Sequence, residues 1–247
     1  LNHEVKGSDF VVTLSNGQVI TIPVGESSVT GPAIAVRPDD AQAQGSVDTV
    51  VKIDSTSGGN FEAVDTTSTA TTSVTDSGAA TTLTITPSAA NVTEGGSIVY
   101  TVTLSNAVAG SPLTLTLSNG QTVTIPVGQT TGTTDPYAVR ADDVYKQAND
   151  TIEVTVADKT GGNFETLNTT GTATTIVSDD ADTTVVTVTP SVTTVAEGGS
   201  ISYTVSLNHE VKGSDFVVTL SNGQVITIPV GESSVTGPAI AVRPDDA

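Results

Sequence analysis

The sequence predicts an all-β protein made of tandem immunoglobulin-like β-sandwich domains, with about 103 residues per repeat. Residues 1–41 recur without a difference at 207–247, and the motif SNGQ begins at Ser15, Ser118 and Ser221, 103 residues apart each time. This period exceeds the roughly 20 to 50 residues of solenoid repeats, so each repeat should close its own core. Only 3% of residues are aromatic, and Thr, Val, Ser and Gly dominate, which favours strands and turns over helices.

The period divides the chain into three parts. Residues 1–79 form a partial repeat that lacks its first two strands, 80–182 form a complete repeat, and 183–247 form a partial repeat that lacks its last two strands. Because the identical segments lie two periods apart, the larger unit is a two-domain repeat of 206 residues. We expect each repeat to contact its neighbours in the chain. We also expect the partial repeats to belong to a continuous fibre or to be completed head to tail by neighbouring chains.

Alternating apolar and polar residues predict seven strands in the complete repeat, at 81–86, 97–104, 113–117, 122–127, 137–140, 151–157 and 171–177. The turn signals EGG, AVAGSP, SNG, GQTTGTTDP, DDVYKQAND and GGN lie between them. In LTLTL at 113–117 and TVTI at 122–125, Leu, Val and Ile fall on one face and Thr on the other, as a half-buried strand requires. Seven short strands with regular turns are typical of an immunoglobulin-like sandwich.

The net charge of −19 narrows the possible partners. With eight basic and 27 acidic residues, the chain is not expected to bind nucleic acid or an anionic membrane surface. No apolar run is long enough to span a membrane, so no membrane insertion is expected in this region. The sequence contains no Cys and no Gly-rich phosphate loop, and no His accompanies a Ser nucleophile motif, so we expect no catalysis.

Strand parity gathers acidic residues at one end of the complete repeat. If successive strands run antiparallel, the loops after the first, fifth and seventh strands lie at the same end. Those loops carry Glu94, the pair Asp142 and Asp143, and the pair Asp179 and Asp180, with Asp182 following. Carboxylates this close together need a counter-charge.

Calcium fits this pattern because it takes six to eight oxygen ligands in irregular geometry, whereas magnesium needs a strict octahedron. No set of His or Cys is present for zinc. The alternative is that these are ordinary turn residues on a soluble surface. Recurrence of the Asp pair in every repeat favours calcium. The further candidate ligands in the partial repeats are Asp39, Asp40, Asp76, Glu197, Asp245 and Asp246.

Three motifs carry a resemblance to a known family: VTEGGSIVYTVTLSNAVAGSPLTLTLSNGQTVTIPVG, AVRADDVYKQ and VSDDADTT. They resemble the extender repeats of LapA-like RTX biofilm adhesins of Gram-negative bacteria, and their acidic loops are similar to those of Calx-β modules. The resemblance implies an extracellular protein of the bacterial cell surface, exported by type I secretion. It implies a calcium-rigidified extender that projects a distal adhesive region for cell attachment and biofilm formation. A repeated low-affinity carbohydrate- or protein-binding module is the alternative.

Overall fold

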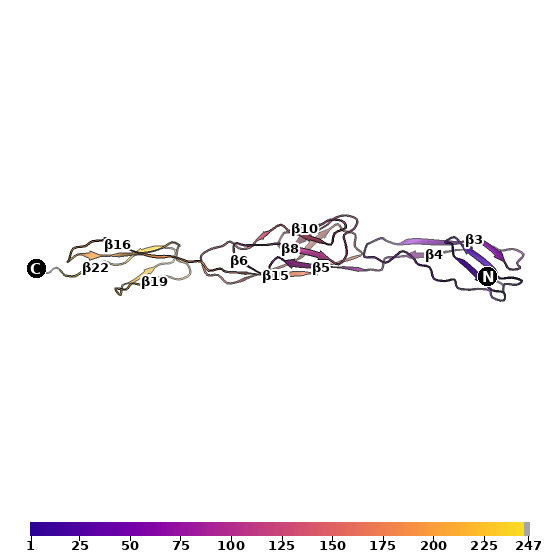
Figure 1. Ribbon diagram of the computed structural model, residues 1–247, viewed down its shortest axis with the longest axis horizontal. Helices are drawn as coiled ribbons and strands as arrows, with labels where there is room; N and C mark the ends of the chain where they lie inside the picture. The colour runs from indigo at the N-terminus through magenta and orange to yellow at the C-terminus, as the bar shows by residue number, and fades with distance from the viewer. Residues whose placement is uncertain (245–247) are drawn as a thin grey trace. The chain divides into compact units, whose positions relative to one another are not determined.

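The computed structural model describes residues 1–244, and Figure 1 shows strands joined by loops and turns, with no helix in this part of the chain. The all-β class predicted from the sequence is confirmed. Across the same residues there is accordingly no long apolar helix that could cross a membrane.

Internal contacts divide the chain into two compact units. Unit 1 comprises Leu1–Thr86, Thr101–Thr134 and Val154–Thr172. Unit 2 comprises Pro87–Tyr100, Asp135–Glu153 and the chain from Ala173 onward. The division passes through the second repeat, and the repeat boundaries at 79/80 and 182/183 stay a prediction from the sequence.

The first repeat contributes a four-stranded antiparallel sheet to unit 1, in the order β2-β1-β3-β4. Its strands are β1 (Phe10–Leu14), β2 (Val19–Ile22), β3 (Val47–Gly58) and β4 (Thr69–Val74). The turn between β1 and β2 depends on Gly17, whose φ of +84° is a left-handed conformation that glycine adopts at little cost. Phe10 is buried, and its ring meets Phe61 edge to face with the centroids 5.4 Å apart.

Two sheets organise the second repeat, one in the order β10-β9-β13-β15-β6 and the other in the order β11-β8-β5-β14. The strands are β5 (Ala80–Pro87), β6 (Asn91–Thr93), β8 (Tyr100–Leu104), β9 (Leu113–Leu117), β10 (Thr122–Ile125), β11 (Thr131–Thr133), β13 (Asp150–Thr160), β14 (Thr166–Asn168) and β15 (Thr172–Ser178). In β9 the three Leu side chains are buried while the Thr side chains between them are partly exposed. This alternation places one face of the strand on the core.

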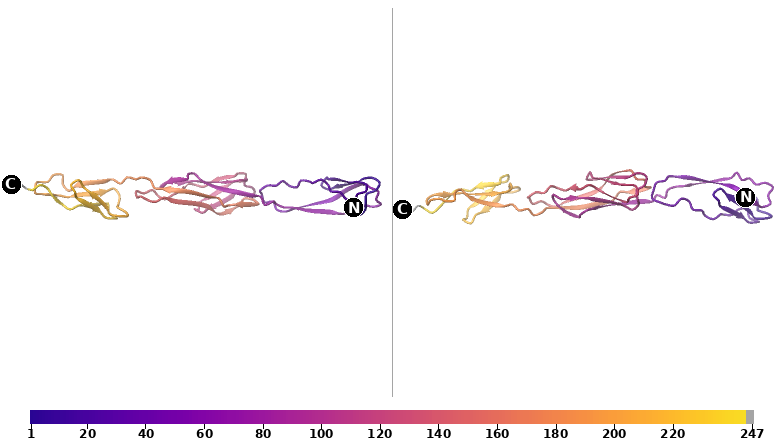
Figure 2. Two further views of the ribbon diagram at one scale, coloured as in Figure 1. Left: turned by 90° about the horizontal axis from the view of Figure 1, so that it is seen from below. Right: turned by 45° about the horizontal axis from the view of Figure 1, so that its top comes forward.

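Unit 2 also contains the pair β7 (Ser97–Ile98) and β12 (Tyr137–Ala138). The third repeat adds a sheet of β16 (Val186–Pro190), β18 (Tyr203–Leu207) and β21 (Ser234–Thr236), and the pairs β17 (Ser200–Ile201) with β22 (Ile240–Ala241) and β19 (Phe216–Thr219) with β20 (Val225–Ile228). These strands, orange to yellow, stay together in both views of Figure 2. They enclose a small core of Val205, Val211, Ile226 and Ile228.

All seven predicted strands of the second repeat are present, with two differences. The predicted strand 97–104 is interrupted at Val99, because β7 pairs with β12 whereas β8 pairs with β11. The three-residue strands β6, β11 and β14 were not predicted. They are too short to show alternation, and β6 and β14 pair in parallel with β15 and β5, which lie far away in the sequence.

Candidate metal centre

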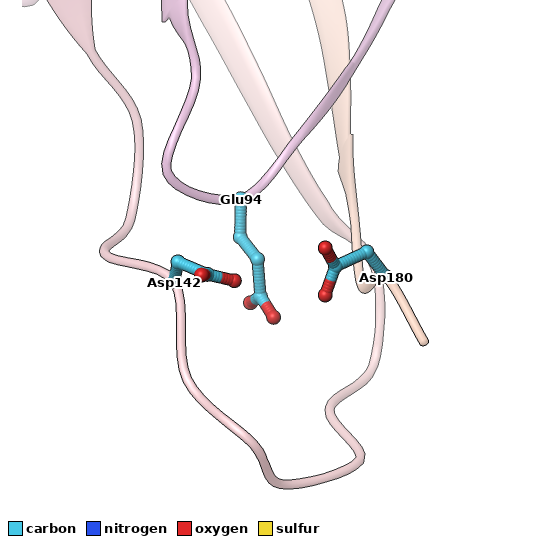
Figure 3. Close-up of side chains that lie close together, drawn as sticks. All are labelled: Glu94, Asp142 and Asp180. Carbon is cyan, nitrogen blue, oxygen red and sulfur yellow. The ribbon is translucent and has the colours of Figure 1, made fainter. Parts of the chain in front are cut away.

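Three loops of unit 2 bring carboxylates together. Glu94 follows β6, Asp142 follows β12 and Asp180 follows β15. Each offers a carboxylate oxygen, and these atoms all lie within 4.8 Å of one another. Figure 3 shows Glu94 between Asp142 and Asp180, with the three carboxylates turned toward one another. Glu94 is buried, whereas Asp142 and Asp180 are exposed.

Backbone hydrogen bonds hold these loops in place. At the end of the parallel β6–β15 pair, Thr93 lies opposite Ser178, and the Glu94 amide donates to the Ser178 carbonyl at 2.9 Å. The Gly95 amide donates to the Arg140 carbonyl at 2.8 Å, which fastens the loop after β12 to the EGG turn. Main-chain hydrogen bonds therefore position the loops that carry the three carboxylates.

Gly95 allows the close approach of the loop that carries Asp142. Its φ is +71°, and a Cβ placed on it would lie 2.9 Å from the Cβ of Asp142. Real Cβ contacts are not this short, so a side chain at position 95 would displace Asp142. Two constraints thus favour glycine at position 95: the positive φ and the short distance to Asp142.

The two carboxylate oxygens of Glu94 lie in different environments. Its side chain is 0% exposed, and Oε2 accepts a hydrogen bond from Arg140 Nε at 2.7 Å. Oε1 is buried and has no hydrogen-bond partner among residues 1–244. A buried carboxylate oxygen without a partner is costly, and two further carboxylates, of Asp142 and Asp180, lie close to this residue.

Arg140 is the internal counter-charge of this end of the repeat. Besides Glu94, its Nη1 donates to the Ala148 carbonyl at 2.7 Å and to Asp150 at 2.9 Å, and Nη2 lies 3.9 Å from Asp179. The hydrogen bond to Glu94 is the main cause that raises the pKa of Arg140 above its usual value. In the sequence this residue stands out as part of the motif Arg140-Ala141-Asp142-Asp143, written RxDD. A further signal was present, because the chain has three arginines, at 37, 140 and 243, and each lies 103 residues after the one before it.

Asp180 lies in a negative environment. Loss of solvent raises the pKa of its carboxyl above the ordinary value of 3.8, and the nearby carboxylates of Asp182, Asp142 and Asp179 raise that pKa further. Arg140 makes ion pairs with Glu94 and Asp179. The arrangement therefore favours a cation at Glu94, Asp142 and Asp180.

Asp143 and Asp179 have other partners. Asp143 closes the local turn, accepting from the Tyr145 amide at 2.7 Å and from the Gln147 side chain. Asp179 accepts from the Gln147 amide at 3.0 Å. Their counterparts one period earlier, Asp40 and Asp76, accept from the matching amides of Gln42 and Gln44. These four carboxylates thus share a structural role in shaping the loop.

The other candidates are not members of the group of three carboxylates. Asp182 lines a small pocket beside Asp180, and Asp39 lines one with Arg37 and Asp76. Arg37 pairs with Asp76 at 2.5 Å. In the third repeat, Glu197 pairs with Arg243 at 3.0 Å, as Glu94 does with Arg140. Asp245 and Asp246 lie outside the described residues.

Fold and site together define a tandem β-sandwich protein with a candidate metal centre at the end of a repeat. The chain belongs to the LapA domain family, which matches residues 2–77, 79–180 and 182–247. This confirms the resemblance drawn from the EGGS, RxDD and DDAD motifs. No curated protein matches the chain.

Solved structures with some similarity include the adhesin FdeC of Escherichia coli. It is 15% identical over 98% of this chain and 97% of that one, with a TM-score of 0.23. A DUF4785 family protein of Legionella pneumophila is 12% identical over 98% of this chain and 68% of that one, with a TM-score of 0.24.

Proposed function

We propose that this chain is a calcium-rigidified extender of a large bacterial surface adhesin, a spacer that projects a distal adhesive region. The Glu94 carboxylate carries the proposal. One of its oxygens accepts from Arg140 and the other is buried and unpartnered, and a carboxylate oxygen of this residue lies within 4.8 Å of those of Asp142 and Asp180. A cation at this point would satisfy the orphaned oxygen and offset the repulsion among the three carboxylates.

The ligand types favour calcium. All three groups are carboxylates, and they come from three separate loops, a hard and irregular oxygen set that suits calcium. Glu94, Asp142 and Asp180 would hold the ion. Bound calcium would supply a positive charge that ties together the loops after β6, β12 and β15. Because the loop after β15 leads out of the second repeat, this tie would restrict movement of the linker.

Membership of the LapA domain family supports an adhesin role. Under this proposal the chain works outside the cell, at the bacterial surface, as a structural protein rather than an enzyme. An extracellular calcium site need only be weak, since dissociation constants around 10⁻⁴ to 10⁻³ M are common in such modules. In an array of many repeats, the stabilisation by calcium at each weak site would add up along the chain.

Thermal unfolding and small-angle X-ray scattering of the full chain test this proposal. With calcium at about ten times its dissociation constant, each site should add about 1.4 kcal/mol to the free energy of unfolding. The scattering should report a larger maximum dimension in calcium than in chelator. The same melting temperature and maximum dimension in both buffers would contradict the proposal.

A further inference from the structure

We propose that residues 41–43 of the first repeat and the GGNFE loop of the second, residues 161–165, form a docking interface that joins these repeats without a cation. Both segments belong to unit 1. The interface is distinct from the acidic cluster of Glu94, Asp142 and Asp180, which belongs to unit 2. The partner that this surface fits is therefore an adjacent copy of the repeat.

Main-chain hydrogen bonds form the centre of the interface. Gln42 and Phe164 make an antiparallel β-bridge. On either side, the Ala43 amide donates to the Asn163 carbonyl at 3.1 Å and the Glu165 amide donates to the Ala41 carbonyl at 3.0 Å. The Asn163 side chain adds a bond to the Ala43 carbonyl at 2.9 Å. This is a short form of β-strand addition, in which the backbone supplies the affinity.

Glu165 fastens the linker between the two repeats. Its Oε2 accepts from the Ala79 amide at 2.6 Å and lies 3.4 Å from the Ser77 hydroxyl. The residues one period later are Asp180 and Asp182, so the second repeat has two carboxylates where the first has a hydroxyl and a methyl group. At the first junction the glutamate thus meets hydrogen-bond donors. These donors stabilise the charge of the glutamate.

The chain contains its own comparison for this loop. The same motif occurs in the first repeat at residues 58–62. There Asn60 and Glu62 are exposed. In the second repeat the matching residues Asn163 and Glu165 are partly buried. The difference in exposure is what docking against a preceding repeat would produce.

A side-chain contact of unit 1, made by Gln42, has a counterpart one period later in unit 2. Gln42 Nε2 donates to the Ala107 carbonyl at 3.1 Å, and Tyr145 Oη donates to the Glu210 carbonyl at 3.0 Å. Both the donors and the acceptors are 103 residues apart. The Lys212 ammonium also lies 4.2 Å from the centroid of the Tyr145 ring, a cation–π contact. The same loop position therefore contacts the following repeat through two different side chains.

Amide hydrogen exchange of the full chain in excess chelator gives the first test. The amides of Ala43 and Glu165 should exchange slowly, because both donate across the interface. Their counterparts one period away, Lys146 and Glu62, should exchange fast. Equal exchange rates within each matched pair would overturn the proposal.

Distance measurement between spin labels gives the second test. The chain has no cysteine, so Thr49→Cys with Thr122→Cys places labels on exposed residues on either side of the first junction. The distance distribution should stay narrow when calcium is replaced by chelator. Gln42→Ala with Glu165→Ala, or Ala43→Pro, which removes the Ala43 donor, should broaden it. Glu62→Ala, at the exposed copy of the loop, should leave it unchanged.

Two outcomes would overturn this interface. One is a distribution that broadens in chelator without any substitution. The other is a distribution that neither variant changes. A matching label pair across the second junction, Thr122→Cys with Thr219→Cys, reports on calcium separately. If the distance distribution of this second label pair were the same with and without calcium, the result would contradict the proposed function but not the docking interface.

Discussion

Arg140 Nε donates to Glu94 Oε2 at 2.7 Å, while Oε1 of the same buried carboxylate has no hydrogen-bond partner among the described residues, 1–244. The Arg140 guanidinium thus satisfies one oxygen, and under the proposed function calcium would satisfy the other. We expect the loops to fold around Arg140 in the absence of metal. Calcium would then add rigidity to a structure that already exists, which suits a weak extracellular site.

Replacing Arg140 with Gln should destabilise the second repeat. The change leaves the buried Glu94 without its counter-charge and also frees Asp150 and Asp179. We expect the melting temperature in chelator to fall by roughly 4 to 8 °C or more. Arg243→Gln is the control, because Arg243 is 81% exposed and an exposed ion pair contributes little. Equal melting temperatures for the two variants would show that Arg140 is not the centre of the network.

Gly95→Ala should weaken calcium binding as well as stability. A positive φ costs an alanine about 1 to 2 kcal/mol, and the new Cβ would also push Asp142 away. Gly120→Ala is a matched control, since Gly120 has a φ of +82° and a Cβ placed on it would meet nothing within 4 Å. Both variants should lose stability, but only Gly95→Ala should bind calcium more weakly in a calorimetric titration. Unchanged calcium affinity in Gly95→Ala would contradict the packing argument.

The pH dependence of stability should reflect Asp180. Its pKa is raised in the folded chain, so the folded state binds this proton more tightly than the unfolded state does. In chelator, the resulting stability is present below 3.8, the ordinary value, and is lost as the pH rises through the higher folded pKa. Thermal unfolding of the wild type and Asp180→Asn from about pH 3 to pH 7 isolates this contribution. The wild type should lose stability relative to the variant as the pH rises, and a constant difference would contradict the raised pKa.

The same titration should affect calcium. Because calcium binds the deprotonated carboxylate, its affinity should rise as the pH passes through the folded pKa of Asp180. The Asp180→Asn variant should bind more weakly and lose this part of the pH dependence. Calorimetric titrations at several pH values would measure both effects. Parallel curves for the two proteins would exclude Asp180 as a ligand.

Leu115→Ala should test whether the second repeat has a packed core of its own. Leu115 is fully buried at the centre of β9, and such a truncation typically costs 2 to 5 kcal/mol, so we expect about that loss. Val127→Ala is the control because Val127 is 50% exposed, and its effect should be much smaller. Denaturant unfolding would compare the two. Similar losses would mean that the core lies elsewhere.

The sequence predicted the fold class and the general place of the acidic cluster. Alternation in LTLTL located β9 and its buried face, and strand parity placed Glu94, Asp142 and Asp180 at one end of the repeat. These features depend on local patterns repeated at a fixed period. Local patterns can be recognised in the sequence without knowledge of the fold, because the residues of each strand and turn favour its conformation.

What the sequence did not show depends on partners distant along the chain. Asp142 and Asp143 look equivalent in the RxDD motif, yet Asp143 turns inward to cap its own loop. The ion pair between Arg140 and Glu94 joins residues 46 positions apart, and only the fold brings them together. The parallel pairing of β6 with β15 also has no local signal. Local patterns therefore located the loops but could not assign a role to each carboxylate within them.

Isothermal calorimetry should show directly whether the acidic cluster binds calcium, when the wild type is compared with a variant that combines Asp142→Asn and Asp180→Asn. Asp39→Asn serves as the control, because in the first repeat the counterpart of Asp180 is Ser77. We expect the double variant to lose one calcium site and the control to retain it. The same number of sites with the same affinity in the wild type and the double variant would contradict this expectation.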